Sequence, residues 1–580
     1  MRYTFAVIAF IGLCVLGAPL GAAADSLEQQ VAFTVNPAFD AKERDTLLAS
    51  LRKITDQLYF YVEDEWWGLL TTAERQRALS NLDELALRFE NEIYPGLTSR
   101  FGPEERPGID NDLRITILIH RMKGGLEGGY VNRADFYTKF ESPKSNEREM
   151  LYLGAQEISS PLAKSYLAHE LTHVLYFSQK KAQRELQGDT WFEEGLAEVA
   201  STLLGYDNPG ENSYSALRLE QFVRDPQNPL AEWQNLLADY GVAHVFFQYV
   251  KDQYGPEFLA ELMHSHQTGI AAFNDVLAKR QRTETFHDIF TNWSIAVFLN
   301  DCSYGTQYCF SNPNFKNLRV VPRTNFLSPF GESQLTVSLQ TKNWAGNWHR
   351  ISGGKGELQI VFDGNPGVRF VVPYLIQGQN NGYSLGFFDL SSEQLGTLRV
   401  PEFGDKHTAL VILPSIQQQT SGFENSPSSF FSWTVSTTSE NDVTNTDQAS
   451  LLQQIAQLQA QVQALQEELR LLRGGGENQT ACSFNENLSY GTRNQNGVKC
   501  LQEFLSRQGL DVYPEGLVTG NFLSLTREAV IRFQEKHATD ILAPYGLNKG
   551  TGLVGQTTRK KINELLQSQD IILTISQGGV

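Results

Sequence analysis

The first long region of the chain, residues 25–312, is dominated by apolar residues that recur at helical spacing. One such run presents its members on a single face of an α-helix, and they are Leu162, Leu167, Leu171, Val174 and Leu175. Ser160 and Pro161 precede this run, which predicts an N-cap with proline at the first helical position. The pattern therefore predicts a buried helix inside a folded domain.

Residues 313–437 change to short runs in which apolar and polar residues alternate, as at 357–362 and 368–372. Glycine-rich turns separate these runs, and alternation with a period of two is typical of strands with one buried face. The pattern predicts an all-β module with a β-sandwich architecture. Its aromatic residues either fill the sandwich or bind a surface, and we expect core positions for Trp344, Trp348, Phe387 and Phe388.

A polar segment and a heptad repeat follow the β module. Residues 438–450 are mostly Ser, Thr, Asn and Asp, which is the composition of a solvated linker. Residues 451–473 carry apolar side chains at both core heptad positions, a pattern that favours a parallel two-stranded coiled coil and a homodimer. A single amphipathic helix packed on its own protein is the alternative. A second linker, 474–480, begins with three glycines.

The first 24 residues have the composition of an export signal. Arg2 precedes an apolar run, and alanines at 22–24 form a cleavage site of the A-x-A type before Asp25. An uncleaved membrane anchor is the alternative, but Pro19 and Gly21 favour cleavage. No other stretch approaches the ~18 uncharged apolar residues that span a bilayer. We therefore expect an exported bacterial protein that is extracellular or associated with the cell envelope.

Composition narrows the possible partners. The chain has 580 residues, enough for several domains, and its 41% hydrophobic and 20% charged residues are typical of a folded protein. Its 48 Lys and Arg residues against 66 Asp and Glu residues give a net charge of -18. A chain this acidic repels phosphate backbones, so nucleic acid is not expected as a partner. No long internal repeat is evident.

Four cysteines remain after the expected cleavage, and they fall into two local pairs. Cys302 is close in sequence to Cys309, and Cys482 to Cys500. An even number of cysteines in an exported chain favours two disulfides. A zinc knuckle is the alternative, but the spacings contain no C-x-x-C step.

A motif with metal-binding spacing lies on the predicted helix: His-Glu-x-x-His at residues 169–173. His169 and His173 are four residues apart, so both imidazoles lie on one helical face and two nitrogens can bind one zinc ion. Glu170 projects alongside, where it can act as a general base toward water. The motif predicts one catalytic Zn²⁺ ion.

A third ligand is expected on a neighbouring helix, and residues 189–198 offer one. Thr190 and Glu193 have the spacing of a capping box. With the histidine motif, the run Trp-Phe-Glu-Glu-Gly-Leu-Ala-Glu resembles the gluzincin metallopeptidases, whose third zinc ligand is the Glu before Gly-(Leu/Phe)-(Ala/Thr). The resemblance implies that Glu194 is the third ligand and that Glu198 hydrogen-bonds a ligand histidine. Glu193 is then a capping neighbour.

The similarity covers about residues 30–300 and is closer to hyicolysin-like secreted gluzincins. These share strands that correspond to 113–119 and 150–153 and a Gly-Tyr segment at 129–130. The resemblance implies an α+β catalytic domain of the thermolysin-like gluzincin fold. The spacing between the second histidine and the third ligand departs from the aminopeptidase N branch, and no convincing Gly-Ala-Met-Glu-Asn motif is present. We therefore expect an endopeptidase.

A Tyr-Gly-x-Ala-His run at 240–244 belongs to the same resemblance. In related peptidases a tyrosine or histidine beyond the third ligand donates a hydrogen bond to the oxyanion of the tetrahedral intermediate. The resemblance implies this role for Tyr240 first and His244 second. A purely packed or capping role is the alternative for both.

Three short motifs occur in order within residues 481–568: V-x-x-L-Q, G-x-F-x-x-x-T and A-V-x-x-F-Q. This order resembles the type-one peptidoglycan-binding domain, a small three-helix fold. The matching positions are mostly core and turn residues: Val498, Leu501, Gln502, Phe522, Thr526, Ala529, Val530, Phe533 and Gln534. A long insertion at 540–551, before the last helix, departs from the pattern, and residues 569–580 form a tail. The resemblance implies that this domain retains the protein at the cell wall. The alternative is a three-helix unit used for protein contacts.

Together these features indicate a secreted, cell-wall-associated zinc endopeptidase with Glu170 as general base and a polypeptide substrate. A second hypothesis keeps the zinc chemistry but takes the peptide stems of peptidoglycan as substrate. A third is a wall-bound adhesion or scaffold protein with a vestigial peptidase domain.

Overall fold

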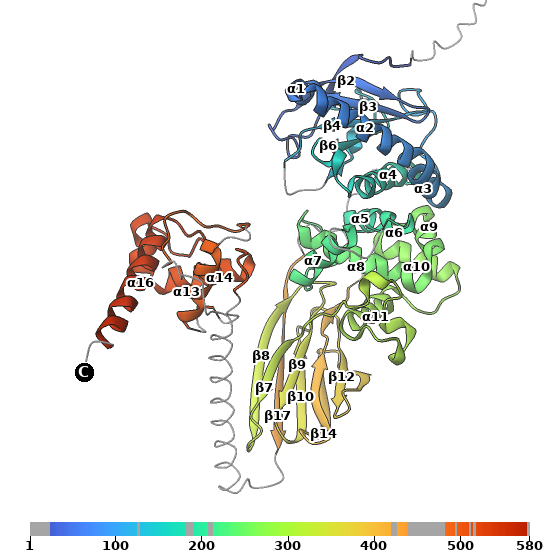
Figure 1. Ribbon diagram of the computed structural model, residues 1–580. Coiled ribbons are helices and arrows are strands. Elements are labelled where there is room, and N and C mark those ends of the chain that lie inside the picture. The colour runs from blue at the N-terminus through green and yellow to red at the C-terminus, as the bar shows by residue number, and fades with distance from the viewer. Residues whose placement is uncertain are drawn as a thin grey trace, which may run out of the picture. The chain divides into compact units, whose positions relative to one another are not determined.

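The computed structural model describes residues 24–123, 128–180, 189–206, 213–418, 426–438, 482–492, 496–509, 512–513 and 518–576. The chain divides into two compact units, Met1–Gln448 and Ala449–Val580, and Figure 1 shows the elements of both. The predicted export signal, both linkers and the heptad repeat lie almost entirely outside the described residues, so the homodimer stays a prediction. Within the described ranges no helix is long and apolar enough to cross a membrane.

A six-stranded mixed sheet forms the first part of unit 1, in the order β1-β2-β3-β4-β6-β5. Its strands are β1 (Gln30–Thr34), β2 (Thr46–Ile54), β3 (Leu58–Glu63), β4 (Ile115–His120), β5 (Gly129–Tyr130) and β6 (Met150–Gly154). The three central strands β3, β4 and β6 are parallel, and β5 pairs antiparallel with β6 at the edge. Every residue of the central strands is buried, because both faces of the sheet are covered.

Helices cover one face of this sheet. Leu82 of α2 (Thr72–Arg88) and Leu171 of α4 (Ala163–Gln179) share a core with Ile117 of β4. The opposite face carries tyrosines and smaller apolar residues in a separate core. Two shorter helices, α1 (Asp64–Leu69) and α3 (Tyr94–Phe101), complete this part. The sheet thus holds α4, with its histidine motif, beside β6 and the edge strand.

A helical part follows and is built around α8 (Leu237–Tyr254), which is buried from Asp239 to Val250. The other helices are α5 (Thr190–Glu198), α6 (Ala200–Leu203), α7 (Tyr214–Arg224), α9 (Pro256–His264), α10 (Gly269–Lys279) and α11 (Phe286–Leu299). Aromatic rings of α5, α8, α10 and α11 pack together in the core. The predicted α+β composition of this region is therefore confirmed.

Two predicted helix starts need correction. Helix α4 begins at Ala163 rather than at Pro161, and the Ser160 hydroxyl accepts a hydrogen bond from the Leu162 N–H just before the helix. At α5 the N-cap residue is Asp189, without a side-chain capping bond, and Glu193 does not form the predicted capping box. The Glu193 carboxylate is instead engaged by side chains from other elements.

The described residues of 313–437, which exclude 419–425, form strands joined by turns after Phe315, as the alternating pattern predicts. Its strands are β7 (Arg323–Leu327), β8 (Ser333–Thr341), β9 (His349–Gly353), β10 (Gly356–Gly364), β11 (Phe370–Val371), β12 (Pro373–Gly378), β13 (Tyr383–Phe387), β14 (Leu395–Phe403), β15 (His407–Ile412), β16 (Ser415–Ile416) and β17 (Ser429–Thr438). Strands β14 and β15 share a single residue pair, so the ladder divides into β13-β12-β15-β9-β7 and β14-β10-β17-β8. Side chains of both layers meet in one core, as in a sandwich.

Trp344 and Trp348 are core residues, as predicted, but they belong to the core shared with the helical part, whereas Trp433 of β17 lies in the core of the sandwich. Trp344 packs against Phe286 and Phe290 of α11, and the Trp348 indole N–H donates to the Ser294 carbonyl at 2.9 Å. Both indoles therefore attach the β module to α11 within one compact unit. Phe388 is buried, whereas Phe387 is 52% exposed, so that core prediction is wrong.

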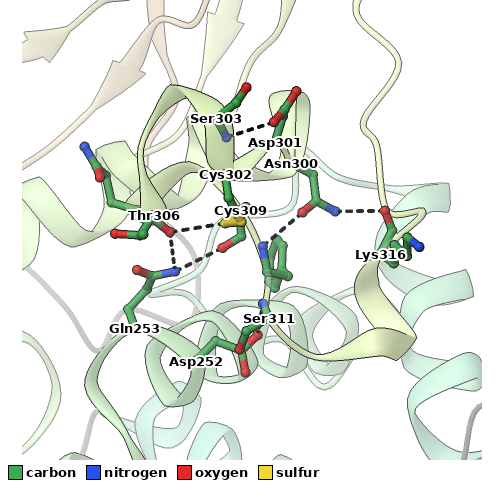
Figure 2. The surroundings of a disulfide bond; sticks show 12 residues. Asp252, Gln253, Asn300, Asp301, Cys302, Ser303, Thr306, Cys309, Ser311 and Lys316 are labelled. Carbon is green, nitrogen blue, oxygen red and sulfur yellow. Dashed lines mark hydrogen bonds between the residues drawn. A yellow bond between two sulfur atoms is a disulfide. The ribbon is translucent and has the colours of Figure 1, made fainter.

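Both predicted disulfides form, Cys302 with Cys309 and Cys482 with Cys500. Figure 2 shows the first one beside the end of α8, where the Gln253 amide donates to the carbonyls of Thr306 and Cys309, each at 3.0 Å. The disulfide loop is thereby fastened to the helix that carries Tyr240 and His244.

The second unit contains α13 (Asn496–Arg507), α14 (Ser524–Lys536), α15 (Ala538–Ile541), a 3-10 turn η8 (Ala543–Tyr545) and α16 (Gln556–Ser576). Its core includes the apolar motif positions predicted to be buried. Gln502 bonds Thr519, Gly520 and Thr526, which follow it by 17, 18 and 24 residues. Gln534 repeats these bonds at the same three separations. The unit thus contains an internal repeat. The predicted insertion at 540–551 is wrong, because this segment is as long as the matching segment of the first copy.

Candidate metal centre

Three side chains from two helices converge on one point. His169 and His173 lie one turn apart on α4, and Glu194 comes from the adjoining α5. The Nε2 atoms of the histidines are 3.1 Å apart, and Oε2 of Glu194 lies 3.3 Å from the first and 3.5 Å from the second. These are the three predicted ligands, and among the described residues they form a group able to hold a metal ion.

The dimensions of this triangle suit zinc. Bonds of about 2.0–2.1 Å at tetrahedral angles place ligand atoms about 3.3–3.4 Å apart. Oε2 of Glu194 is buried and has no hydrogen-bond partner among the described residues. A buried carboxylate oxygen without a partner is unfavourable unless a cation occupies the point it faces. The residues therefore fit the ion that the motif predicts.

Hydrogen bonds on the far side of each imidazole fix which nitrogen carries the proton. Nδ1 of His173 lies 2.8 Å from Oε1 of Glu193, a group that only accepts when ionised. His173 therefore donates from Nδ1 and directs the lone pair of Nε2 toward Glu194. Arg133 contacts the other oxygen of Glu193 and balances its charge.

His169 is oriented through a tyrosine. Its Nδ1 lies 3.1 Å from the Tyr214 hydroxyl, which donates its own proton to Oε1 of Glu198 at 2.7 Å. The hydroxyl has only this proton, so it accepts from Nδ1 of His169. The predicted contact between Glu198 and a ligand histidine is thus made mainly through Tyr214, since the direct distance is 3.6 Å.

Glu198 is the centre of a buried charged network. Arg218 lies 2.8 Å from Oε1 and 3.0 Å from Oε2 of Glu198, and His244 lies 3.1 Å from Oε2. Burial opposes ionisation, but the charge of Arg218 and the hydrogen bond from His244 lower the pKa of Glu198 to about 2. The network therefore keeps a carboxylate charged behind the metal-binding triangle.

The triangle itself attracts positive charge. Burial would lower the pKa of His173, yet the carboxylates of Glu194 and Glu193 raise it well above its ordinary value. Burial likewise opposes the charge of Glu194, whose pKa is nonetheless lowered by His173 and His169. Each group favours the charged form of its neighbour, as expected where a cation binds.

Glu170 lies next to the edge strand of the sheet. It is buried, and a Cβ atom at Gly129 would come within 2.9 Å of its Cγ and 2.6 Å of the Tyr152 carbonyl. Only glycine leaves room here for the β5–β6 pairing and the Glu170 side chain together. The predicted general base thus adjoins the edge strand β5.

The two residues predicted to contact the oxyanion lie behind the triangle. The Tyr240 hydroxyl donates to Oδ1 of Asn235 at 2.8 Å, and its ring packs beside the Arg218 guanidinium. His244 is fully buried between Glu198 and the Ser215 hydroxyl. These hydrogen bonds are all made to other protein groups, so the predicted contact of Tyr240 and His244 with the oxyanion stays a prediction.

Three members of the site were not predicted from the sequence. Tyr214 and Arg218 of α7 bind Glu198, and Glu193 binds a ligand histidine instead of capping α5. The available signal was the i, i+4 spacing of Tyr214 and Arg218, which places both on one face of an amphipathic helix. An arginine that is buried on such a face requires a carboxylate partner.

Comparison with known proteins bears on the second unit. Residues 494–562 match the family model described as a putative peptidoglycan binding domain. This match supports the predicted C-terminal domain and indicates an association with the cell wall. A search of curated proteins finds no match to the chain.

Several solved structures show a weak similarity to parts of the chain. The pre-peptidase C-terminal domain of collagenase from Bacillus anthracis is 7% identical, covers 20% of this chain and 96% of its own, and has a TM-score of 0.15. The Yersinia pseudotuberculosis-derived mitogen is 14% identical, with coverages of 19% and 91% and a TM-score of 0.13. The periplasmic lysozyme inhibitor PliG of Aeromonas hydrophila is 12% identical, with coverages of 20% and 98% and a TM-score of 0.13. Similarity this weak has no bearing on fold or function.

Proposed function

We propose that the protein is an exported zinc-dependent endopeptidase that acts at the bacterial cell wall. The observation that carries the proposal is the convergence of His169, His173 and Glu194 at tetrahedral spacing, with the buried Oε2 of Glu194 facing both Nε2 atoms and lacking a hydrogen bond of good geometry among the described residues. The proposed gluzincin relationship rests on this triangle and on the two helical motifs. Removal of an export signal at residues 1–24 belongs to the same proposal.

Each group of residues at the site has a separate role in the proposed reaction. His169, His173 and Glu194 would hold Zn²⁺, which when bound polarises a carbonyl and increases the acidity of water. Glu170 accepts a proton from the attacking water and passes it to the leaving nitrogen. Glu193 and the Tyr214–Glu198 pair hold both imidazoles in the tautomer that directs Nε2 toward the metal.

A polypeptide substrate is favoured by the edge strand. β5 is the last strand of its sheet and pairs with β6 on one side. An extended peptide that pairs with the other side of β5 would pass beside Glu170. An extended polypeptide backbone has the regular N–H and C=O groups that such pairing requires.

Peptidoglycan stem peptides are the second candidate substrate. The family match at 494–562 indicates an association with the cell wall, which contains these peptides. Stem peptides are too short and irregular to extend a strand ladder over many residues. The two substrates therefore differ in how strongly cleavage depends on β5.

Product analysis separates these functions. The wild type and Glu170→Ala are incubated with an unfolded protein and with purified peptidoglycan, and the products are measured by mass spectrometry. Peptides from the unfolded protein with the wild type alone support the endopeptidase, whereas released stem peptides support the second candidate. Glu220→Ala, on the exposed face of α7, is the matched control. An absence of product from zinc-loaded wild type would refute both and leave a scaffold role.

A further inference from the structure

The second unit contains a pocket that the family match does not assign. Its volume is 470 Å³, within the range of about 300–1,000 Å³ that small-molecule sites occupy. The pocket lies between the α15–η8 segment, Ala538–Tyr545, and the first turn of α16, which begins at Gln556.

Buried hydrogen bonds build the walls of this pocket. The Gln534 side chain is 1% exposed, and its Oε1 accepts the N–H groups of Thr551 and Gly552 at 2.8 and 3.0 Å. Its Nε2 donates to the Leu553 carbonyl at 2.7 Å. On the opposite side the Thr557 hydroxyl donates to the Ile541 carbonyl at 3.1 Å. The pocket is therefore preformed by the fold.

The internal repeat places two equivalent tyrosines in different surroundings. Tyr545 follows Gln534 at the same sequence distance as Tyr513 follows Gln502. Tyr513 is 2% exposed and packs in the core, whereas Tyr545 is 58% exposed and lines the pocket. Leu547 and Leu553, each 42% exposed, lie around the same hollow. Apolar side chains left open around a cavity are typical of a ligand site.

Arg559 gives the pocket its charge. It is the only charged residue in the lining, which contains no Asp or Glu. Nη1 of Arg559 donates a hydrogen bond to the Asn485 carbonyl. Among the described residues, its buried Nε has no hydrogen-bond partner, and no ion pair joins Arg559 to a carboxylate. A guanidinium has five donors in a fork that matches a carboxylate. Arg559 therefore has no carboxylate partner among the described residues, although its chemistry suits one.

We propose that this pocket binds a peptide stem of peptidoglycan by its terminal carboxylate. Arg559 pairs with the carboxylate, while Tyr545, Leu547 and Leu553 contact the small apolar side chains of the stem. The inference rests on the cell-wall association that the family match supports. A carboxylated peptide is favoured over the glycan strand, because neutral sugar rings leave the charge of Arg559 unpaired.

Binding is measured by isothermal titration calorimetry. The parent protein is the full chain with the substitution Glu170→Ala, so that no peptide bond is cut during the titration. The probes are a soluble stem tetrapeptide and peptide-free glycan strands. We expect the tetrapeptide to bind and Arg559→Gln to weaken this binding at least tenfold. Tyr545→Ala should weaken it about fivefold, and it leaves the bond to Asn485 intact. Lys560→Gln, at an exposed position next to Arg559, is the control and should bind within twofold of the parent.

Equal binding of the tetrapeptide by both pocket variants and the parent would overturn the pocket assignment and leave wall association intact. Tighter binding of peptide-free glycan than of the tetrapeptide would overturn the choice of ligand. Failure of the parent chain to bind either probe, or to sediment with insoluble walls, would overturn the underlying wall association as well.

Discussion

Nδ1 of His173 lies 2.8 Å from Oε1 of Glu193, the immediate neighbour of the proposed zinc ligand Glu194. Two consecutive carboxylates of α5 thus serve one centre in different ways. Glu194 supplies an oxygen to the metal-binding triangle, and Glu193 fixes the proton and the ring orientation of a histidine in that triangle. A residue that local spacing assigns to helix capping is thereby part of the site.

Replacing Glu193 with alanine should weaken zinc binding. Loss of a carboxylate that orients a ligand histidine typically costs about 10- to 100-fold in metal affinity. Competition with a zinc chelator measures the change, with Glu220→Ala as an exposed control from α7. Unchanged affinity in the Glu193 variant would show that the imidazole of His173 is held by other contacts.

Gly129→Ala should reduce peptidase activity while zinc content stays constant. The new Cβ would lie 2.6 Å from the Tyr152 carbonyl and 2.9 Å from Cγ of Glu170, so both the edge strand and the proposed base must shift. We expect kcat/KM to fall at least tenfold. Gly68→Ala is the matched control, since a Cβ there meets nothing within 4 Å. Equal activity of the two variants would contradict the proposed position of the substrate.

Glu149 should make the folded domain less stable as the pH rises. Burial raises its pKa from 4.5 to about 7, with Asp110 adding to the effect and the Ile109 N–H opposing it. The folded state holds this proton more tightly than the unfolded chain. Its contribution to stability is therefore complete below about pH 4.5 and lost by about pH 7.

The matching experiment compares urea unfolding of the wild type and Glu149→Gln at pH 4 and pH 8. The glutamine oxygen can still accept the Ile109 N–H. Relative to this variant, the wild type should lose about 3 kcal/mol of unfolding free energy between the two pH values. A parallel pH dependence in both proteins would assign the loss to other groups.

Deletion of residues 481–580 should abolish sedimentation with purified cell walls but leave cleavage of a soluble polypeptide. The family match lies wholly within the deleted segment, whereas the metal-binding triangle lies in the first unit. Deletion of 569–580 alone is the control and should sediment like the full chain. Retained sedimentation of the larger deletion would place wall binding elsewhere.

Local sequence patterns were sufficient for several elements. The helical run with His169 and His173 predicted α4, because i, i+4 spacing defines a helical face without reference to the rest of the chain. Alternation after residue 313 predicted the strands of the β module, and cysteine pairing predicted both disulfides. The order of three short motifs predicted the domain that the family match supports.

Local patterns failed where a residue's partner comes from another element. Tyr240 and His244 share a face of α8, but only packing shows that their polar atoms contact Asn235 and Glu198. Trp344 and Trp348 were correctly expected to be buried, yet their core is shared with α11 rather than with the sandwich. Burial follows from composition, whereas the identity of the neighbour does not.

The sequence by itself determined which side chains can bind a metal, because residue type and helical periodicity are local properties. The tertiary structure alone decided how these side chains are used. It brings Tyr214, Arg218 and Glu193 behind the histidines, and it leaves Tyr545 at an open pocket while Tyr513 fills a core. The reason is physical: hydrogen-bond partners, burial and charge compensation depend on distances between segments far apart in the chain, which no local pattern encodes.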